Sequence, residues 1–436
     1  MSQLKTKNSK QKTQKVSAVE IQKAASLLEG RVIRTPIVYS PTLSRVAKKF
    51  EVYLKLENLQ VTGSFKIRGA TCKILTELDR IGRGGVVAAS AGNHAQGVAL
   101  AASRAGLPST IVMPEWASIS KQEATRAYGG EVIVEGQSLD DSINKALELA
   151  RGGKTFIHPF DDPLIIAGQG TIGLEIMEEL PDAGVIAVPV GGGGLISGIS
   201  TAARSLKPGI RIVGVQAGAC PSALKAVETG KRVTVEALRS IADGIAVKQI
   251  GRIPFDIVGK KVDEIVLADE DRIAEAVIML LERKKILAEG AGAVCVAALL
   301  NGDIEAPPGE KAVLVISGGN IDISLLDRVI RKGLSRNGRI MRFAVRLDDV
   351  PGALAKLLNV IAAAKANVLQ ISHNRGGADM SIHQSQVELE IETRNLEHNR
   401  AIEAALDLAG YHREICDGQN PGTSRTTPCP LNISTI

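Results

Sequence analysis

Short apolar runs alternate with longer amphipathic segments from Val52 to Ser317. Six runs rich in β-branched residues are predicted as strands, at residues 52–57, 85–90, 110–114, 185–190, 212–216 and 312–317. Helical patterns are predicted between them, at 94–107, 139–150 and 270–287 among others. Strands that are apolar on both faces and alternate with helices are typical of mostly parallel sheets covered on both sides. The fold class is therefore α/β, and ligands are expected in the loops that leave the strands.

The sequence pattern changes after Arg339 and predicts a second, smaller unit. A strand at 340–347 is followed by a helix within 348–367, strands at 368–375 and 384–393, and a helix at 395–412. This order is typical of a small α+β unit of the ferredoxin-like kind. We therefore expect a main region at 17–335, with a smaller subdomain at about 55–160, and a second domain at 339–415. The Lys-rich residues 1–16 and the Gly-, Pro- and Ser-containing residues 416–436 are predicted to be loose tails.

Composition excludes several classes of protein. The net charge of +6 comes largely from the N-terminal tail, at Lys5, Lys7, Lys10, Lys12 and Lys15, and aromatic residues make up 3% of the chain, so nucleic-acid binding is not expected. Five scattered cysteines form no Cys-x-x-Cys pair, which argues against a structural zinc site. No apolar stretch approaches the ~18 residues of a membrane span, and no secretory signal is recognised. We expect a cytoplasmic protein without a membrane partner.

A run of four glycines follows the predicted strand at 185–190. Gly191, Gly192, Gly193 and Gly194 open the helical pattern that contains Ser197 and Gly198. Consecutive glycines allow backbone N–H groups to converge on an anion at a helix N-terminus. The sixth position of a dinucleotide fingerprint is not glycine here, so the motif predicts a phosphate site and not an NAD site.

Three further polar motifs lie at predicted strand ends or helix starts. Lys66 lies in the motif of residues 57–70, where a helix start would favour the neutral, nucleophilic form of the amine. Residues 90–97 (SAGNHAQG) and 317–320 (SGGN) follow two other strands. A phosphate cup, a nucleophilic lysine, an anion-binding turn and a serine at one sheet edge together describe a pyridoxal-phosphate site.

Six ordered motifs over about residues 17–335 resemble those of the serine/threonine dehydratases, which have the tryptophan-synthase-β-like (fold-type II) fold of pyridoxal-phosphate enzymes. They are TGSFKIRGA, SAGNHAQGVA, AGQGTIG, PVGGGGLISG, AEGAGA and SGGNID, and they match the catabolic-type threonine dehydratases best. The resemblance implies two open, mostly parallel sheets, pyridoxal 5'-phosphate as cofactor, and conversion of L-threonine to 2-oxobutanoate and ammonia, with L-serine as a second substrate.

The resemblance also implies a role for each matching residue. Lys66 carries the cofactor and acts as catalytic base, and Phe65 lies against the ring. The glycine run binds the phosphate, Asn93 the ring hydroxyl and Ser317 the pyridine nitrogen, while Gly244 and Glu289 line the cofactor pocket. Ser64, Ser90, Gly92, Asn93 and His94 surround the substrate carboxylate.

Three alternatives to the dehydratase remain. Serine racemases share most motifs but have a serine at the position of Ala91, whose methyl group cannot deliver a proton. Metal-dependent relatives have carboxylates where this chain has Gln216 and Ala219, so no metal site is expected. Loss of the lysine would have favoured a non-catalytic amino-acid sensor, but Lys66 is present.

The terminal unit resembles the ACT domains, which are amino-acid-sensing regulatory modules, through the motif at 349–354 (DVPGAL). The resemblance implies an effector site near Gly352, Ala353, Leu354 and Asn367, at an interface between two such units, with isoleucine or valine as effector. A homodimer or homotetramer is expected by the same likeness. The alternative is a structural or dimerising appendage.

Overall fold

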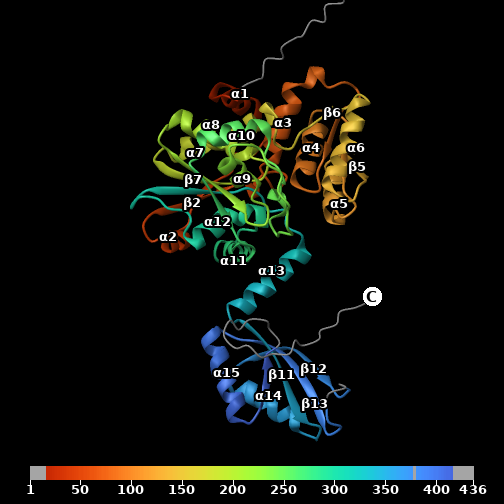
Figure 1. Ribbon diagram of the computed structural model, residues 1–436, viewed down its shortest axis with the longest axis vertical. Helices are drawn as coiled ribbons and strands as arrows, with labels where there is room; N and C mark the ends of the chain where they lie inside the picture. The colour runs from red at the N-terminus through yellow and green to blue at the C-terminus, as the bar shows by residue number, and fades with distance from the viewer. Residues whose placement is uncertain (1–15, 377–379, 416–436) are drawn as a thin grey trace, which may run out of the picture. The chain divides into compact units, whose positions relative to one another are not determined.

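The computed structural model describes residues 16–376 and 380–415 (Figure 1). The predicted N-terminal tail, apart from Val16, and the predicted C-terminal tail at 416–436 lie outside these residues. The chain divides into two compact units between Leu326 and Asp327, within helix α13 (Ile323–Arg336). The two units are described separately below.

The first unit contains a six-stranded sheet in the order β1-β2-β10-β7-β8-β9. Its strands are β1 (Ile37–Tyr39), β2 (Glu51–Leu56), β7 (Ala183–Pro189), β8 (Arg211–Ala217), β9 (Glu264–Ala268) and β10 (Lys311–Ile316). All pairs are parallel except β1 with β2. Parallel pairing brings the carboxyl ends of β7 and β10 to the same edge.

A second sheet of four parallel strands lies in the same unit, in the order β5-β4-β3-β6. It contains β3 (Val86–Ala89), β4 (Ser109–Met113), β5 (Gly130–Val134) and β6 (Thr155–Phe156). The six strands that the sequence predicts are all present. β1, β5, β6 and β9 were not predicted, because β1 and β6 are two or three residues long and β5 and β9 are only partly buried.

Helices cover both sides of the larger sheet, as Figure 1 shows, with α7, α8 and α10 on one side and α11 and α12 on the other. The side chains of Ile172, Ile196 and Val188 are fully buried in the core between α7, α8 and the sheet. The helices of this unit are α1 (Ala18–Leu28), α2 (Pro41–Ala47), α3 (Lys66–Thr76), α4 (Asn93–Arg104), α5 (Ile119–Ala127), α6 (Leu139–Arg151), α7 (Pro163–Glu179), α8 (Gly194–Leu206), α9 (Ser222–Thr229), α10 (Arg252–Lys261), α11 (Glu270–Met279) and α12 (Gly290–Asn301).

The helix predicted for residues 270–287 ends earlier than expected. The α-helix α11 ends at Met279 and is followed by a single π-helical stretch, Leu280–Lys284. Lys285 then takes a left-handed conformation with φ of 58°. A non-glycine residue at positive φ ends a right-handed helix, so the apolar periodicity that continues to Leu287 does not produce further helix.

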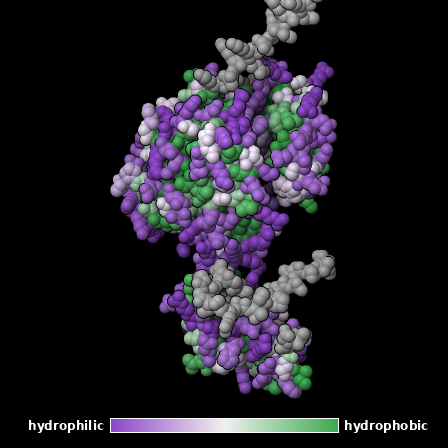
Figure 2. Space-filling view, viewed as in Figure 1, coloured by the Kyte–Doolittle hydropathy of each residue, from purple (hydrophilic) through white to green (hydrophobic). Residues whose placement is uncertain are grey.

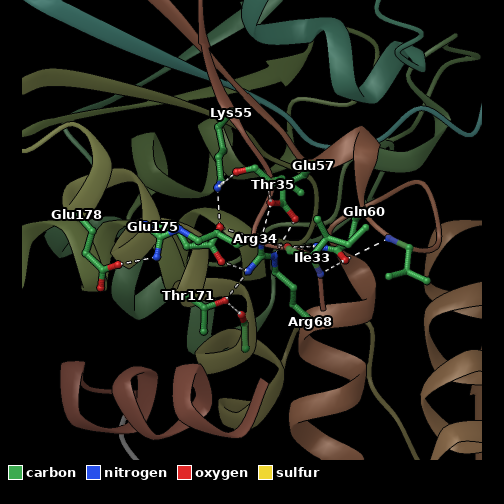
Figure 3. Close-up of polar contacts among 12 residues, drawn as sticks. Ile33, Arg34, Thr35, Lys55, Glu57, Gln60, Arg68, Thr171, Glu175 and Glu178 are labelled. Atoms are coloured by element: carbon green, nitrogen blue, oxygen red, sulfur yellow. Dashed lines mark hydrogen bonds and ion pairs between the residues drawn. The ribbon is translucent and has the colours of Figure 1, made fainter. Parts of the chain in front are cut away.

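A cluster of four charged side chains is buried between β2, α3 and α7 (Figure 3). Arg68 donates hydrogen bonds to Glu57 at 2.8 Å and to Glu175 at 2.5 Å, and Lys55 donates to Glu175 at 2.5 Å. Each of these side chains is at most 13% exposed. Two positive and two negative charges balance, as burial of ionised groups requires. The cluster ties α3, which begins at Lys66, to the larger sheet and to α7.

The second unit follows a β-α-β-β-α-β order. Its elements are β11 (Ile340–Asp348), α14 (Ala353–Ala363), β12 (Asn367–Asn374), β13 (Gln384–Glu392), α15 (Leu396–Leu408) and β14 (Arg413–Ile415). The antiparallel sheet has the order β12-β13-β11-β14, and Phe343, Leu357 and Ile402 belong to the core between sheet and helices. The five predicted elements are present at the predicted places, and β14 is an additional edge strand.

Hydrophilic residues cover most of the surface visible in Figure 2, and hydrophobic residues occur among them in smaller areas. In the ranges 16–376 and 380–415, none of the helices is both long enough and apolar enough to cross a bilayer.

Candidate active site

A cavity of about 180 Å³ in the first unit collects nearly all of the residues that the motifs single out. It opens at the carboxyl ends of β3, β7 and β10, which is where the strand pattern places a ligand. The sequence-predicted residues on its wall are Phe65, Lys66, Ser90, Gly92, Asn93, His94, Gly191, Gly192, Gly193, Gly194, Gly244, Glu289 and Ser317. Ser64 is the one predicted residue of this site that does not line the cavity.

Lys66 is the first residue of α3, and its Nζ donates a hydrogen bond to the carbonyl oxygen of Pro159 at 3.0 Å. Burial lowers the pKa of Lys66 to about 8, and the charge of Glu289 acts in the opposite direction. The sequence suggests the helix dipole as the cause of this shift, whereas loss of hydration is the larger effect. About a tenth of the amine is therefore neutral, and nucleophilic, at pH 7, far more than for an ordinary lysine.

The glycine run connects β7 to α8 and packs closely against neighbouring side chains. A Cβ at Gly192 would collide with the ring of Phe160, and Gly193 has a φ of 90° that favours glycine. α8 begins at Gly194 and has thirteen residues. The amides of its first turn have no intrahelical partner, so they and the positive end of the helix dipole suit an anion such as phosphate.

Glu289, which also lines the cavity, is hydrogen-bonded to Asn93 at the start of α4. Its Oε1 accepts a hydrogen bond from Asn93 Nδ2 at 2.6 Å, and Asn320 Nδ2 donates to Asn93 Oδ1 at 2.7 Å. Burial, reinforced by the charge of Asp243, raises the pKa of Glu289 to about 7. This carboxyl group can therefore hold or release a proton near neutral pH. The Ser317 hydroxyl is buried nearby, 3.4 Å from the carbonyl oxygen of Ala291.

The loop from Ser90 to His94 presents small polar groups at the start of α4. Ser90 Oγ accepts a hydrogen bond from the Gly92 amide at 3.2 Å. His94 Nε2 lies 2.9 Å from the carbonyl oxygen of Ile157, and because a carbonyl can only accept, this nitrogen carries the proton. Ser64 pairs with Gly318 through its backbone, and its buried hydroxyl has no partner among the described residues.

We expect His94 to make the free energy of unfolding depend on pH. Burial lowers the pKa of His94 from 6.5 to about 3. Between these values the unfolded chain binds a proton that the folded protein does not, so stability decreases as the pH falls from 6.5 towards 3. The expected slope from this group is up to about 1.4 kcal/mol per pH unit. Urea titrations at several pH values should therefore give a shallower slope for His94→Gln than for the wild type; equal slopes would contradict this assignment.

Several residues of the cavity wall could not be predicted from the sequence motifs. Trp116, Lys121 and Phe160 come from segments without a recognised motif, although all three line the cavity. Lys121 contacts Asp243 at 3.2 Å, and this pair joins the α5 side of the cavity to the loop that contains Gly244. Gln169, which also lines the cavity, lies within the AGQGTIG motif, but the sequence did not predict a role for it.

The sequence profile of pyridoxal-phosphate dependent enzymes matches residues 28–318. The chain belongs to this family. Pyridoxal phosphate is therefore its cofactor, and the cavity fits it: the free amides of the glycine run at the start of α8 suit its phosphate, and Lys66 offers an amine of lowered pKa in the same cavity. These two features are the phosphate cradle and the reactive amine that such a cofactor needs.

Similar proteins include two enzymes named L-threonine ammonia-lyase. The one from Thermotoga maritima is 50% identical over 404 residues, which cover 92% of this chain and 99% of the relative. The one from Geobacter sulfurreducens is 47% identical over 392 residues, covering 90% and 97%. Both alignments are longer than the first unit, which ends at Leu326. They therefore extend beyond the catalytic motifs and include most of the second unit.

Solved structures with the same fold include the processed form of threonine deaminase isoform 2 from Solanum lycopersicum, with a TM-score of 0.67 and 36% identity over 72% of this chain and 86% of that chain. Maize serine racemase has a TM-score of 0.69 and 32% identity over 74% of this chain and all of the other. The two-sheet architecture of the first unit is thus shared by enzymes with different named activities, and residues near the cavity must distinguish them.

Gln216, at the position where the metal-dependent relatives are expected to have a carboxylate, has a structural role. It is fully buried, and its Oε1 accepts hydrogen bonds from the amides of Ala223 and Leu224 at 3.1 and 3.2 Å. The side chain therefore caps the first turn of α9. Within the described ranges, no group of three or more His, Cys, Asp or Glu side chains is arranged to hold a metal ion.

Proposed function

We propose that this protein is a dehydratase that converts L-threonine to 2-oxobutanoate and ammonia, with L-serine to pyruvate as a second activity. One observation carries this proposal: the amine of Lys66, whose pKa is lowered, lies in the same cavity as the glycine run and Ser317. The names of the two relatives at 47 and 50% identity support the same reaction. By the motif likeness, we place the enzyme with the catabolic-type dehydratases of the cytoplasm.

In this proposal each wall of the cavity holds one part of the cofactor. Lys66 attaches it, the amides of the glycine run bind its phosphate, and Ser317 donates to its pyridine nitrogen. Phe65, Asn93, Gly244 and Glu289 surround the ring. When bound, pyridoxal phosphate supplies an electron-accepting system next to the substrate α-carbon. The neutral Ser317 hydroxyl does not protonate the ring nitrogen, which suits loss of the β-hydroxyl better than transamination.

Lys66 then serves as the proton acceptor. With the cofactor bound, the Nζ of Lys66 would accept the α-proton of the substrate, and its lowered pKa places it close to the working pH. Ser90, Gly92, Asn93 and His94 hold the substrate carboxylate at the start of α4, where the free helix amides and the dipole favour an anion, whereas Ser64 does not line the cavity. The β-hydroxyl would leave as water, with a proton from the cofactor phosphate or from a water held at the glycine run, and hydrolysis of the resulting 2-aminobut-2-enoate would give ammonia and 2-oxobutanoate.

The first experiment is to add L-threonine and L-serine separately to the purified protein. Absorbance of the bound cofactor and formation of 2-oxo acid are recorded together, and D-serine is assayed in the serine sample. We expect both 2-oxo acids and little D-serine, because Ala91 on the cavity wall has no proton to donate. Bound cofactor without any 2-oxo acid would contradict the proposal and favour a sensor, and abundant D-serine would favour a racemase.

We also propose that the second unit is an ACT-type regulatory domain that binds isoleucine or valine. Its β-α-β-β-α-β order supports this proposal. Gly352, with a φ of 87°, precedes the first turn of α14, which Ala353 and Leu354 begin, and Asn367 opens β12. Free amides at a helix start suit an amino-acid carboxylate. Binding at an interface between two such units would make the active protein a homodimer or homotetramer.

The effector proposal predicts a specific result for Asn367→Ala. We expect the effector concentration for half-maximal response to rise by at least about tenfold, which is the loss of one hydrogen bond to a charged group. Turnover without effector should be unchanged, because Asn367 belongs to the second unit. Ser372→Ala, on the same exposed strand, is the matched control. An unaltered response in Asn367→Ala would place the effector elsewhere.

A further inference from the structure

The turn at residues 158–161, between β6 and α7, provides part of the wall of the candidate active site. Pro159 and Phe160 line the cavity, whereas His158 does not. Among these four residues, all of which the structure describes, no backbone–backbone hydrogen bond closes the turn. Instead, Nδ1 of His158 accepts hydrogen bonds from the amide of Phe160 at 3.2 Å and from the amide of Asp161 at 2.8 Å. The conformation of the turn therefore depends on one ring nitrogen.

These two hydrogen bonds determine the protonation state of His158. A backbone N–H can only donate, so Nδ1 carries a lone pair and the ring proton is on Nε2. Burial lowers the pKa of His158 below its ordinary value of 6.5, which favours the same neutral ring. The ring also packs edge-on against the rings of Phe156 and Phe160, with centroids 6.0 and 4.8 Å apart. His158 can therefore act through its acceptor nitrogen or through ring packing, and substitutions can separate the two roles.

The three residues that follow His158 each contact a different part of the site. The carbonyl oxygen of Pro159 accepts the hydrogen bond from Lys66 Nζ at 3.0 Å. The ring of Phe160 lies against the glycine run, in the place that a Cβ of Gly192 would occupy. Asp161 accepts hydrogen bonds from the first two amides of α10, at 2.9 and 2.8 Å. The turn thus contacts the amine of Lys66, the glycine run and the start of α10.

One peptide group connects His158 to the amine of Lys66. The carbonyl oxygen that accepts from Lys66 and the amide that donates to His158 belong to the same planar peptide group, between Pro159 and Phe160. The C=O and N–H bonds of a trans peptide group point in opposite directions. Because the ring nitrogen holds the amide at one end of this rigid group, it directs the oxygen at the other end towards the amine.

We propose that His158 is a positioning residue of the active site, and that its Nδ1 fixes the turn at 158–161. The turn in this conformation lets Pro159 hold the free amine of Lys66 and lets Phe160 support the glycine run. This inference rests on the proposed function, in which Lys66 attaches the cofactor and accepts the α-proton and the glycine run binds the phosphate.

Two substitutions of equal shape test the acceptor nitrogen. In His158→Asn, the amide oxygen is as many bonds from the backbone as Nδ1 and can accept from amides further along a turn, as asparagine side chains commonly do. His158→Leu has the same branched shape and no acceptor. Both variants lose the ring, so a role in packing alone would favour leucine beside the rings of Phe156 and Phe160.

Dialysis of each holoenzyme against a series of pyridoxal-phosphate concentrations, with bound cofactor measured by its absorbance, gives the dissociation constant. We expect a value within about threefold of the wild type for His158→Asn and an increase of at least about tenfold for His158→Leu, which loses two hydrogen bonds. The kcat for threonine at saturating cofactor should follow the same order, with a loss of at least about tenfold in His158→Leu, because the free amine is displaced.

The proposal is overturned if His158→Leu binds the cofactor as the wild type does, or if His158→Asn binds it as weakly as His158→Leu. If His158→Leu does not fold, His158→Asn decides alone, since a tenfold loss there would show that the ring and not the acceptor is needed. Lys66→Ala, measured alongside, separates this result from the proposed function. If that variant kept the band of attached cofactor, the placement of the cofactor would be wrong and the inference on His158 would be wrong with it.

Discussion

Replacing Lys66 with alanine should reduce threonine turnover by at least about a thousandfold, because the variant loses both its cofactor attachment and its base. The amine of Lys66 is the cavity group whose lowered pKa, about 8, suits proton removal near neutral pH. The absorbance band of the cofactor attached to the protein should disappear in the same variant. Turnover and the visible spectrum, measured in one cuvette, report the two losses together.

A matched control separates this effect from a general loss of structure. Lys73 lies two turns further along the same helix and pairs with Glu77 and Asp162, each at 2.8 Å. Lys73→Ala should therefore keep the cofactor band and most of the turnover, although one end of α3 becomes less firmly held. If Lys66→Ala retained more than a tenth of the wild-type turnover, Lys66 would not be the base, whatever the spectrum showed.

Arg68→Leu is expected to lower the free energy of unfolding by about 3–5 kcal/mol. Arg68 is the side chain that contacts both buried carboxylates, Glu57 and Glu175 (Figure 3). Its removal leaves two negative charges in the interior with only Lys55 to balance them. Urea unfolding of the holoenzyme, followed by circular dichroism, measures the change.

Two companion variants test this explanation. Arg34→Gln removes the ion pair between Arg34 and Glu178, which are 54% and 53% exposed. Because both side chains are in solvent, the free energy of unfolding should change by no more than about 1 kcal/mol. The double variant Arg68→Leu with Glu57→Gln removes one charge of each sign, so it should be more stable than Arg68→Leu alone. If the double variant were less stable than the single one, an uncompensated charge would not be the cause.

Much of the candidate site could be predicted from the sequence because its motifs are local. The glycine run, the SAGNH loop and Ser317 each follow a strand of a parallel sheet, and such strands end at a common edge. Lys66 could be singled out because its motif, TGSFKIRGA, occurs in the same chain as these others. Phe160 and Lys121 reach the same cavity from segments whose patterns say nothing about their neighbours.

The buried charges show the limit of sequence reasoning most clearly. Lys55, Glu57, Arg68 and Glu175 are residue types that are mostly found at protein surfaces, and their spacing in the chain does not link them. Only the packing of β2, α3 and α7 brings them within hydrogen-bond distance.

The sequence by itself determined the fold class, the strand-end motifs and the two-unit organisation of the described chain, because periodicity and glycine-rich turns act over a few residues. The tertiary structure alone decided how far Lys66 and Glu289 are removed from water, and hence that their pKa values move to about 8 and about 7. Hydration of a side chain depends on every segment packed around it, and these segments are distant in sequence.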